Sequence, residues 1–163
     1  MPTPTYTPLQ TITLGSTASS VTFASIPQTY RDLVLVLTAL GSATLEGRVR
    51  LNSDSGSHYH SVRMSGNGSS PTSASLGSQT SGSISTVATA TTGGALQTEL
   101  QVMDYSATNK HKTMLSRSGQ SAVATEAVVL RWASTAAVTT VEILTSEGSF
   151  EIGATFSIYG IEA

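Results

Sequence analysis

The densest group of side chains that could bind a metal ion lies at residues 52–56 (NSDSG). Oxygen ligands at alternate positions, followed by glycine, are typical of the opening of a calcium loop. Such a loop ends on a bidentate glutamate at its twelfth position, where this chain has Arg63. We therefore interpret the segment as an Asx turn between two strands, in which Asn52 and Asp54 bind nearby backbone groups. We predict no metal site, and Asn52 and Asp54 are the weak candidates for one.

His58 and His60 are two residues apart, so in a strand their side chains share one face. Two such histidines could supply half of a zinc site, and His111 is the only other histidine in the chain. A site with three ligands would keep an open position and could be catalytic. We interpret the pair instead as an exposed strand edge, and we predict no cofactor.

Nucleophilic catalysis would need a serine beside a base that a carboxylate orients. The chain has no Gly-x-Ser-x-Gly segment, and its serines are so numerous that one near a histidine indicates nothing. Glu99, Glu126 and Glu142 fall at strand positions that could face one another, as the paired carboxylates of glycosidases do. We interpret them as ordinary solvated side chains, and we predict no catalytic residue and no enzyme.

Three aromatic residues could stack on a sugar: Tyr59, Tyr105 and Trp132. Trp132 alternates in phase with Val128 and Leu130, which favours a place in the core. Tyr59 is the better candidate for an exposed ring.

The elements that position these residues are predicted to be strands. Serine and threonine make up nearly a third of the chain, while charged residues make up only 11%. Because the hydroxyl residues alternate with Val, Ile, Leu and Phe, the pattern indicates half-buried strands rather than disorder. The runs are short, and Gly, Ser and Pro turns separate them, which favours an all-β, antiparallel β-sandwich, jelly-roll-like and of a single domain. The expected strands are residues 9–14, 20–26, 32–40, 47–52, 59–64, 95–105, 112–117, 124–132, 138–145, 150–152 and 154–161.

Two segments depart from this pattern. Residues 1–8 contain three prolines, which predicts an extended N-terminal arm ahead of a sandwich domain at residues 9–163. Residues 65–94 are almost all Ser, Thr, Gly and Ala, which predicts a long loop. This loop either contains a short hairpin near residues 83–89 or orders only against a partner.

Two strands carry a prediction about which faces are buried. The apolar run at residues 32–40 predicts a central strand that is covered on both faces. In the strand at residues 59–64, Val62 and Met64 are expected to point inward.

The amino-acid composition limits the kinds of partner that the protein is expected to bind. The net charge is −2 and Lys110 and Lys112 are the only lysines, so we predict no nucleic-acid partner. The chain has no cysteine for a disulfide or a thiolate metal site. Its longest apolar run, residues 33–40, is too short to span a membrane. No basic segment followed by an apolar run opens the chain, so no secretory signal is expected.

Several blocks of the sequence are specific in combination: residues 8–15 (PLQTITLG), 21–23 (VTF), 26–33 (IPQTYRDL), 51–59 (LNSDSGSHY), 66–68 (GNG), 132–138 (WASTAAV) and 156–161 (FSIYGI). With these blocks the chain resembles a recurrent virion protein of tailed bacteriophages over nearly all of its length outside residues 69–94. Proteins of this kind are described as virion structural, tail-fibre or capsid-decorating proteins. The resemblance implies a β-sandwich that assembles as a homotrimer and has a binding role without chemistry.

Two places on the virion are compatible with this resemblance. In the first, the protein is a decoration or cement protein that binds the major capsid protein on the capsid exterior and stabilises the assembled head. In the alternative, it is a tail-fibre or receptor-binding tip that recognises host-surface carbohydrate. We favour decoration, because the sequence contains no heptads, collagen repeat or second domain that would form a shaft. The residues expected to contact a partner are Pro2, Pro4, Tyr6, Pro8, Tyr59, Pro71 and Leu76.

Overall fold

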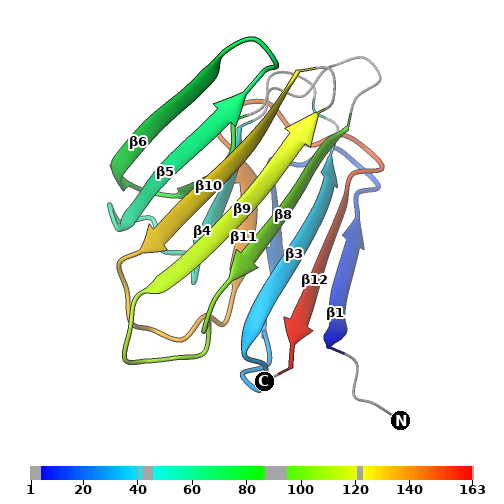
Figure 1. The fold of residues 1–163 in the computed structure, drawn as a ribbon. Helices are drawn as coiled ribbons and strands as arrows, with labels where there is room; N and C mark the ends of the chain where they lie inside the picture. Colours follow the sequence, from blue (N-terminus) through cyan, green and yellow to red (C-terminus); the bar gives the residue numbers. More distant parts are fainter. Residues whose placement is uncertain (1–4, 40, 42–45, 87–94, 121–122, 163) are drawn as a thin grey trace.

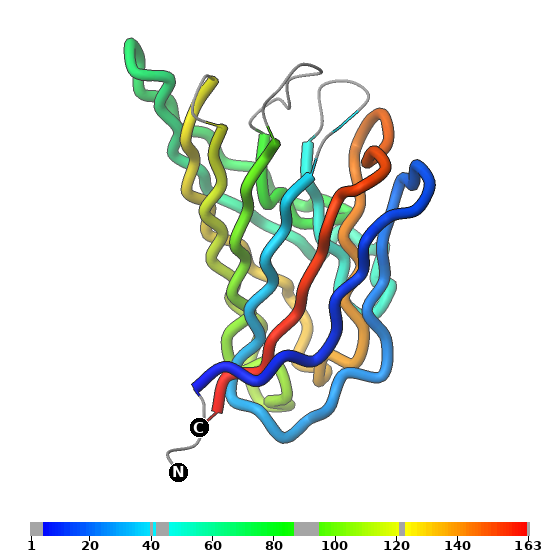
Figure 2. Tube along the Cα trace, turned by 90° about the vertical axis from the view of Figure 1, so that its right-hand side faces the viewer, coloured from blue at the N-terminus to red at the C-terminus, as the bar shows by residue number. Residues whose placement is uncertain are grey.

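The computed structural model describes residues 5–39, 41, 46–86, 95–120 and 123–162, which form strands stacked in two layers (Figures 1 and 2). The strands are β1 (Tyr6–Thr13), β2 (Ser20–Phe23), β3 (Asp32–Ala39), β4 (Gly47–Leu51), β5 (Tyr59–Gly66), β6 (Pro71–Gln79), β7 (Gly82–Ser85), β8 (Leu96–Val102), β9 (Lys112–Gln120), β10 (Ala124–Trp132), β11 (Val141–Thr145) and β12 (Thr155–Ile161). Within the described residues there is no helix, and hence none that could cross a membrane.

The strands form two antiparallel sheets. The eight-stranded sheet has the order β1-β12-β3-β8-β9-β10-β5-β6, and the four-stranded sheet has the order β2-β11-β4-β7. The chain passes repeatedly from one sheet to the other, as it does in jelly rolls. The prediction of an all-β, antiparallel, single-domain sandwich is confirmed.

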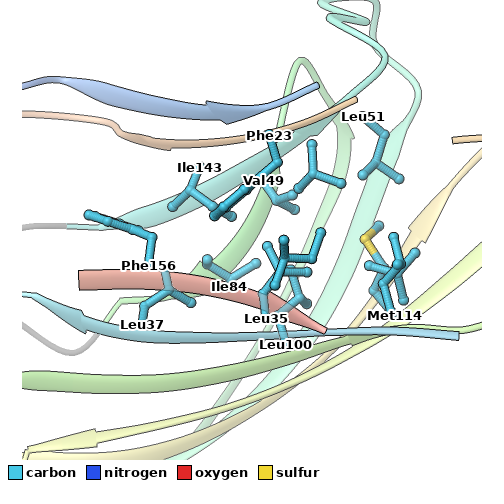
Figure 3. Packing of buried hydrophobic residues seen from close by; sticks show 14 of the residues in the cluster. Phe23, Leu35, Leu37, Val49, Leu51, Ile84, Leu100, Met114, Ile143 and Phe156 are labelled. Atoms are coloured by element: carbon cyan, nitrogen blue, oxygen red, sulfur yellow. The ribbon is translucent and has the colours of Figure 1, made fainter. Parts of the chain in front are cut away.

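The core lies between the sheets, because alternate side chains of each strand point inward. Along β10, Val128, Leu130 and Trp132 are buried and the residues between them are exposed. Figure 3 shows how side chains from the two sheets meet, with Phe23 and Ile143 of the smaller sheet near the larger sheet's side chains. Each such side chain, when fully buried, contributes about 1.5–3 kcal/mol to folding.

The predicted N-terminal arm is too long. Tyr6, Thr7 and Pro8 belong to β1 and pair with Ile161, Gly160 and Tyr159 of β12. Proline is tolerated there because β1 is an edge strand, where a missing N–H breaks no ladder on the open side. Pro2 and Pro4 lie outside the described residues.

The prediction of a long loop at residues 65–94 is also wrong for those of its residues that the structure describes. β5 continues to Gly66, the chain turns, and β6 returns along β5 before β7 joins the smaller sheet. The carbonyl oxygen of the Asn67 side chain accepts hydrogen bonds from the N–H groups of Ser69 and Ser70, and Gly68 takes a φ of 86°. Sheet pairing therefore orders a segment whose own sequence has a weak apolar pattern. Residues 87–94 of the predicted loop lie outside the described residues.

β3 lies inside the sheet as expected, but it is not covered on both faces. Leu33, Leu35 and Leu37 point into the core, whereas Val36 on the opposite face is 40% exposed. Val34 is buried on that outward face, where it lines a recess with Tyr6 and other residues. The apolar run therefore reflects one core face and one local surface cluster.

The side chains of β5 point to the opposite faces from those that the sequence predicted. Val62 and Met64 are 55% and 66% exposed, and Tyr59 and Ser61 are buried in their place. The expected strand at residues 150–152 is reduced to isolated bridges from Phe150 to Ala18 and Gly41.

Candidate functional site

The segment considered for a metal ion is a structural corner. The carbonyl oxygen of the Asn52 side chain accepts hydrogen bonds from the backbone N–H groups of Thr139 and Thr140 at 2.8 and 3.1 Å. Its amide donates to the carbonyl of Ala137 at 2.7 Å. Asn52 therefore ties the turn after β4 to the segment before β11, a contact too distant in sequence for the local turn we predicted.

Asp54 does form the predicted Asx turn, since its Oδ1 accepts a hydrogen bond from the N–H of Gly56 at 2.8 Å. Its Oδ2 lies 2.8 Å from Nδ1 of His58 and accepts the indole N–H of Trp132 at 2.6 Å. Burial raises the pKa of the Asp54 carboxyl, but the hydrogen bonds from Trp132, His58 and Gly56 outweigh burial and lower the pKa below its usual value. These donors occupy the oxygens that a cation would need.

The histidines do not form a metal site with acidic neighbours. His58 is half exposed and pairs with Asp54, while His60 lies on β5 opposite Arg131 of β10. His111 is exposed before β9. Across the part of the chain that the structure describes, no cluster of three or more His, Cys, Asp or Glu side chains could hold a metal ion.

The three strand carboxylates each have a separate partner. Glu99 pairs with Arg117 at 2.7 Å, and Glu142 pairs with Arg50 at 3.1 Å. Glu126 is 3% exposed, so our interpretation of it as a solvated side chain is wrong. Its two oxygens accept hydrogen bonds from the N–H and the hydroxyl of Thr86 at 2.7 and 2.9 Å. Glu99 and Glu142 therefore join neighbouring strands, and Glu126 joins β10 to the segment directly after β7.

The aromatic residues considered for sugar binding are in the core. Tyr59 is fully buried, so our prediction of it as a partner-binding residue is wrong. Its hydroxyl accepts the N–H of Leu51 at 2.9 Å, and burial raises its pKa to about 12. Trp132 stacks beside Tyr59 with ring centroids 6.5 Å apart, as expected of a core residue. Tyr105 is also buried, and its hydroxyl donates to the carbonyl of Pro27.

None of the residues considered so far forms a binding site, and we therefore turn to the outer face of the eight-stranded sheet. This face points away from the smaller sheet and is seen in front view in Figure 1. One apolar group on it, patch A, consists of Val62, Met64, Leu115, Ala127 and Val129. The strand register places Val62 directly opposite Val129, and Val129 directly opposite Leu115. Met64 lies opposite Ala127 in the next row. Patch A is therefore one continuous surface across β5, β10 and β9.

A second apolar group, patch B, consists of Tyr6, Val34, Val36 and Tyr159 on β1, β3 and β12. These side chains line a recess together with Glu99. Tyr6 is 54% exposed. β8 separates the two patches, with Gln97, Glu99 and Gln101 along the same face. The outer face is thus two apolar patches on either side of a polar strand.

The residues predicted from sequence to bind a partner relate to this face in different ways. Tyr6 belongs to patch B, and Pro8 lies opposite Tyr159 in the register. Pro71 and Leu76 of β6 each line a shallow groove beside patch A, the first with Met64 and the second with Val62.

Patch A was not predicted from the sequence. The inward phase of Val128 and Leu130 already implied that Val129 points outward. The sequence of β5 has no such regular alternation. Tyr59 and Val62 are both common in strands and point to opposite faces, so the sequence does not show which of them is buried.

No protein-family model matches the chain, and no curated protein sequence matches it. Among solved structures, galectin LEC-6 from Caenorhabditis elegans is similar with a TM-score of 0.38 and 9% identity, covering 94% of this chain and 96% of that one. An exo-inulinase from Aspergillus awamori is similar with a TM-score of 0.39 and 10% identity. That match covers 96% of this chain and 29% of the inulinase, so this chain spans under a third of the enzyme's length.

Proposed function

We propose that this protein is a phage virion structural protein of the decoration type, which binds the outside of the assembled head as a homotrimer and stabilises it. The observation that carries the proposal is the open outer face of the eight-stranded sheet, with patches A and B on it. Large exposed apolar groups on a soluble protein mark sites of interaction. The sequence resemblance to tailed-phage virion proteins supports the phage head as the particle that this protein binds.

The dimensions of the outer face suit a protein partner. Eight strands about 4.8 Å apart, each about 25 Å long, present a face of very roughly 850 Å². A specific protein interface buries about 800 Å² on each partner. The face is broad, and the ionised side chains at its centre, Glu99 and Arg117, neutralise each other. Such a surface fits another protein surface better than a small charged ligand.

Stabilisation of the head would follow from mass action. A protein that binds several shell subunits only when they are assembled lowers the free energy of the assembled state. A trimer holds three docking faces together, so that each weak contact strengthens the others by avidity.

The copy number of the protein in purified virions tests this placement. We expect a number close to that of the major capsid protein, measured by quantitative mass spectrometry, and loss of head stability on heating when the protein is stripped. A few copies per particle would contradict decoration and would favour the tail.

Patch A gives the test at residue level. We expect Val62→Asp to weaken binding to stripped heads by at least tenfold, because it places a charge in the middle of an apolar contact. Ile152→Asp is the matched control, since Ile152 is 62% exposed but lies outside the sheet. Sedimentation of heads with the labelled variants measures both, and equal losses would contradict docking through patch A.

The alternative, a receptor-binding tip for host carbohydrate, is favoured by one observation. Tyr6 and Tyr159 line one recess of patch B with Glu99, which offers rings for stacking and a carboxylate for hydroxyl groups. Binding of glycans at millimolar or better affinity, together with a low copy number, would support this function over decoration.

A further inference from the structure

β6 forms one end of the eight-stranded sheet, and among the described residues it pairs with β5 alone. The backbone N–H and C=O groups on its other edge are therefore available to a further strand. Residues 72–77 (TSASLG) have no charge, and apart from Leu76 their side chains are small. Pro71 precedes this stretch, and Ser78 with a φ of 54° ends its regular backbone.

The other three sheet edges are protected. β1 carries Pro8 and a register shift directly after it, which are two common means of blocking an edge. β2 and β7 are four residues long, too short to guide a partner strand. β6 has nine residues and no lysine or other charge. Its own proline and register shift lie at its two ends, at Pro71 and between Leu76 and Gln79, and leave residues 72–76 between them without such protection.

We propose that β6 is a self-association edge, where it pairs antiparallel with β6 of a second copy of this chain. A two-fold axis places the same strand on both sides of the contact, so β6 must be compatible with itself. An uncharged strand meets this requirement, since like charges directly opposite each other destabilise a pair of strands. The small side chains leave room for the second backbone to reach the usual spacing of about 4.8 Å.

This contact leaves the outer face free. Strand addition extends the sheet sideways, so patches A and B of both copies stay on one surface. This two-fold contact differs from the three-fold contact of the proposed homotrimer. It joins two copies of the species that exists without it, whether that species is a monomer or a trimer. It also stands without any phage role, and its failure would leave the proposed docking through patch A untouched.

Charge substitutions on β6 provide the test in solution. Ser75 is exposed and lies on the outer face, opposite Val62. We expect Ser75→Lys and Ser75→Glu each to weaken self-association at least tenfold, halving the mass measured by sedimentation velocity. Mixing the two variants should restore the larger species, because the two facing strands then carry opposite charges. Gln10→Lys on the edge of β1 is the matched control and should leave the mass unchanged.

Single cysteines locate the axis, because the chain has no cysteine of its own. Ser73→Cys, Ser75→Cys and Gly77→Cys should show one position that forms a covalent dimer rapidly under mild oxidation. A disulfide needs Cα atoms within about 7 Å, which identical residues reach only near the two-fold axis. Gln10→Cys should not cross-link.

The proposal is overturned if the wild-type protein keeps the same mass as Ser75→Lys at all concentrations. It is also overturned if the mixed variants fail to recover the larger species, or if Gln10→Cys cross-links as fast as the β6 cysteines. Circular dichroism of each variant confirms that the sheet is intact.

Discussion

Asp54 joins three separate parts of the chain. Its carboxylate receives hydrogen bonds from Gly56 in its own turn, from His58 directly before β5 and from Trp132 at the end of β10. Hydrogen bonds to a charged acceptor are stronger than those between neutral groups. The residues that had the spacing of a metal loop therefore fix the corner of the sandwich instead.

We predict that Asp54→Asn lowers the free energy of unfolding by about 1.5–3 kcal/mol, the usual value of hydrogen bonds to a charged group. An amide cannot accept from all three donors, and it carries no charge to attract the imidazole and indole N–H groups. Glu147→Gln, at an exposed position, is the matched control and should change stability little. Urea denaturation at pH 7 measures both variants.

The pH dependence of this effect has a definite direction. The folded-state pKa of Asp54 lies below the ordinary value of 3.8, so its contribution is complete above about pH 4. The contribution is lost as the pH falls through the folded-state pKa. The stability difference between wild type and Asp54→Asn should therefore shrink in acid, and a difference that grows below pH 4 would contradict the assignment.

At the scale of elements, β7 shows how closely the sheets approach each other. All four of its residues are buried, and a Cβ atom on Gly82 would lie 2.6 Å from Cδ2 of Leu130 and 3.1 Å from Cγ1 of Val49. Leu130 and Val49 are themselves fully buried and cannot move aside freely. The short strand β7 thus depends on the absence of a side chain at its first residue.

We predict that Gly82→Ala lowers stability by about 1–3 kcal/mol, the usual cost of overpacking a core. Gly15→Ala is the control, because nothing lies within 4 Å of a Cβ atom there. It should be neutral or slightly stabilising, since alanine restricts the unfolded chain. Thermal unfolding of the two variants measures the difference, and equal melting temperatures would contradict the close packing of β7.

At the scale of the whole molecule, the two layers bury one face of the eight-stranded sheet and leave the other open. Neighbouring residues of β3 show the consequence, since Leu35 is 1% exposed and Val36 is 40% exposed. Both belong to the same apolar run of sequence. Their difference comes from the sheet that packs on one side only.

We predict that Leu35→Ala lowers the free energy of unfolding by about 2–5 kcal/mol, because it leaves a cavity in the core. Val36→Ala should cost well under half as much, because its side chain is already partly in contact with water. Parallel denaturant titrations give both values. Similar large losses would indicate a third layer over the outer face.

The sequence by itself determined the fold class, because alternation of apolar and hydroxyl residues has the period of a strand wherever it occurs. It also determined the burial of Trp132 and the Asx turn at Asp54, where a regular pattern or local turn chemistry decides the structure. It did not determine the phase of β5, the existence of β6 or the burial of Glu126. Val62 and Met64 depend on β10 and Glu126 depends on Thr86, partners that are far away in the sequence, and residues 71–79 become a strand only by pairing with β5. Only the tertiary structure brings these partners together, and it alone gathers patches A and B and leaves β6 as the open edge.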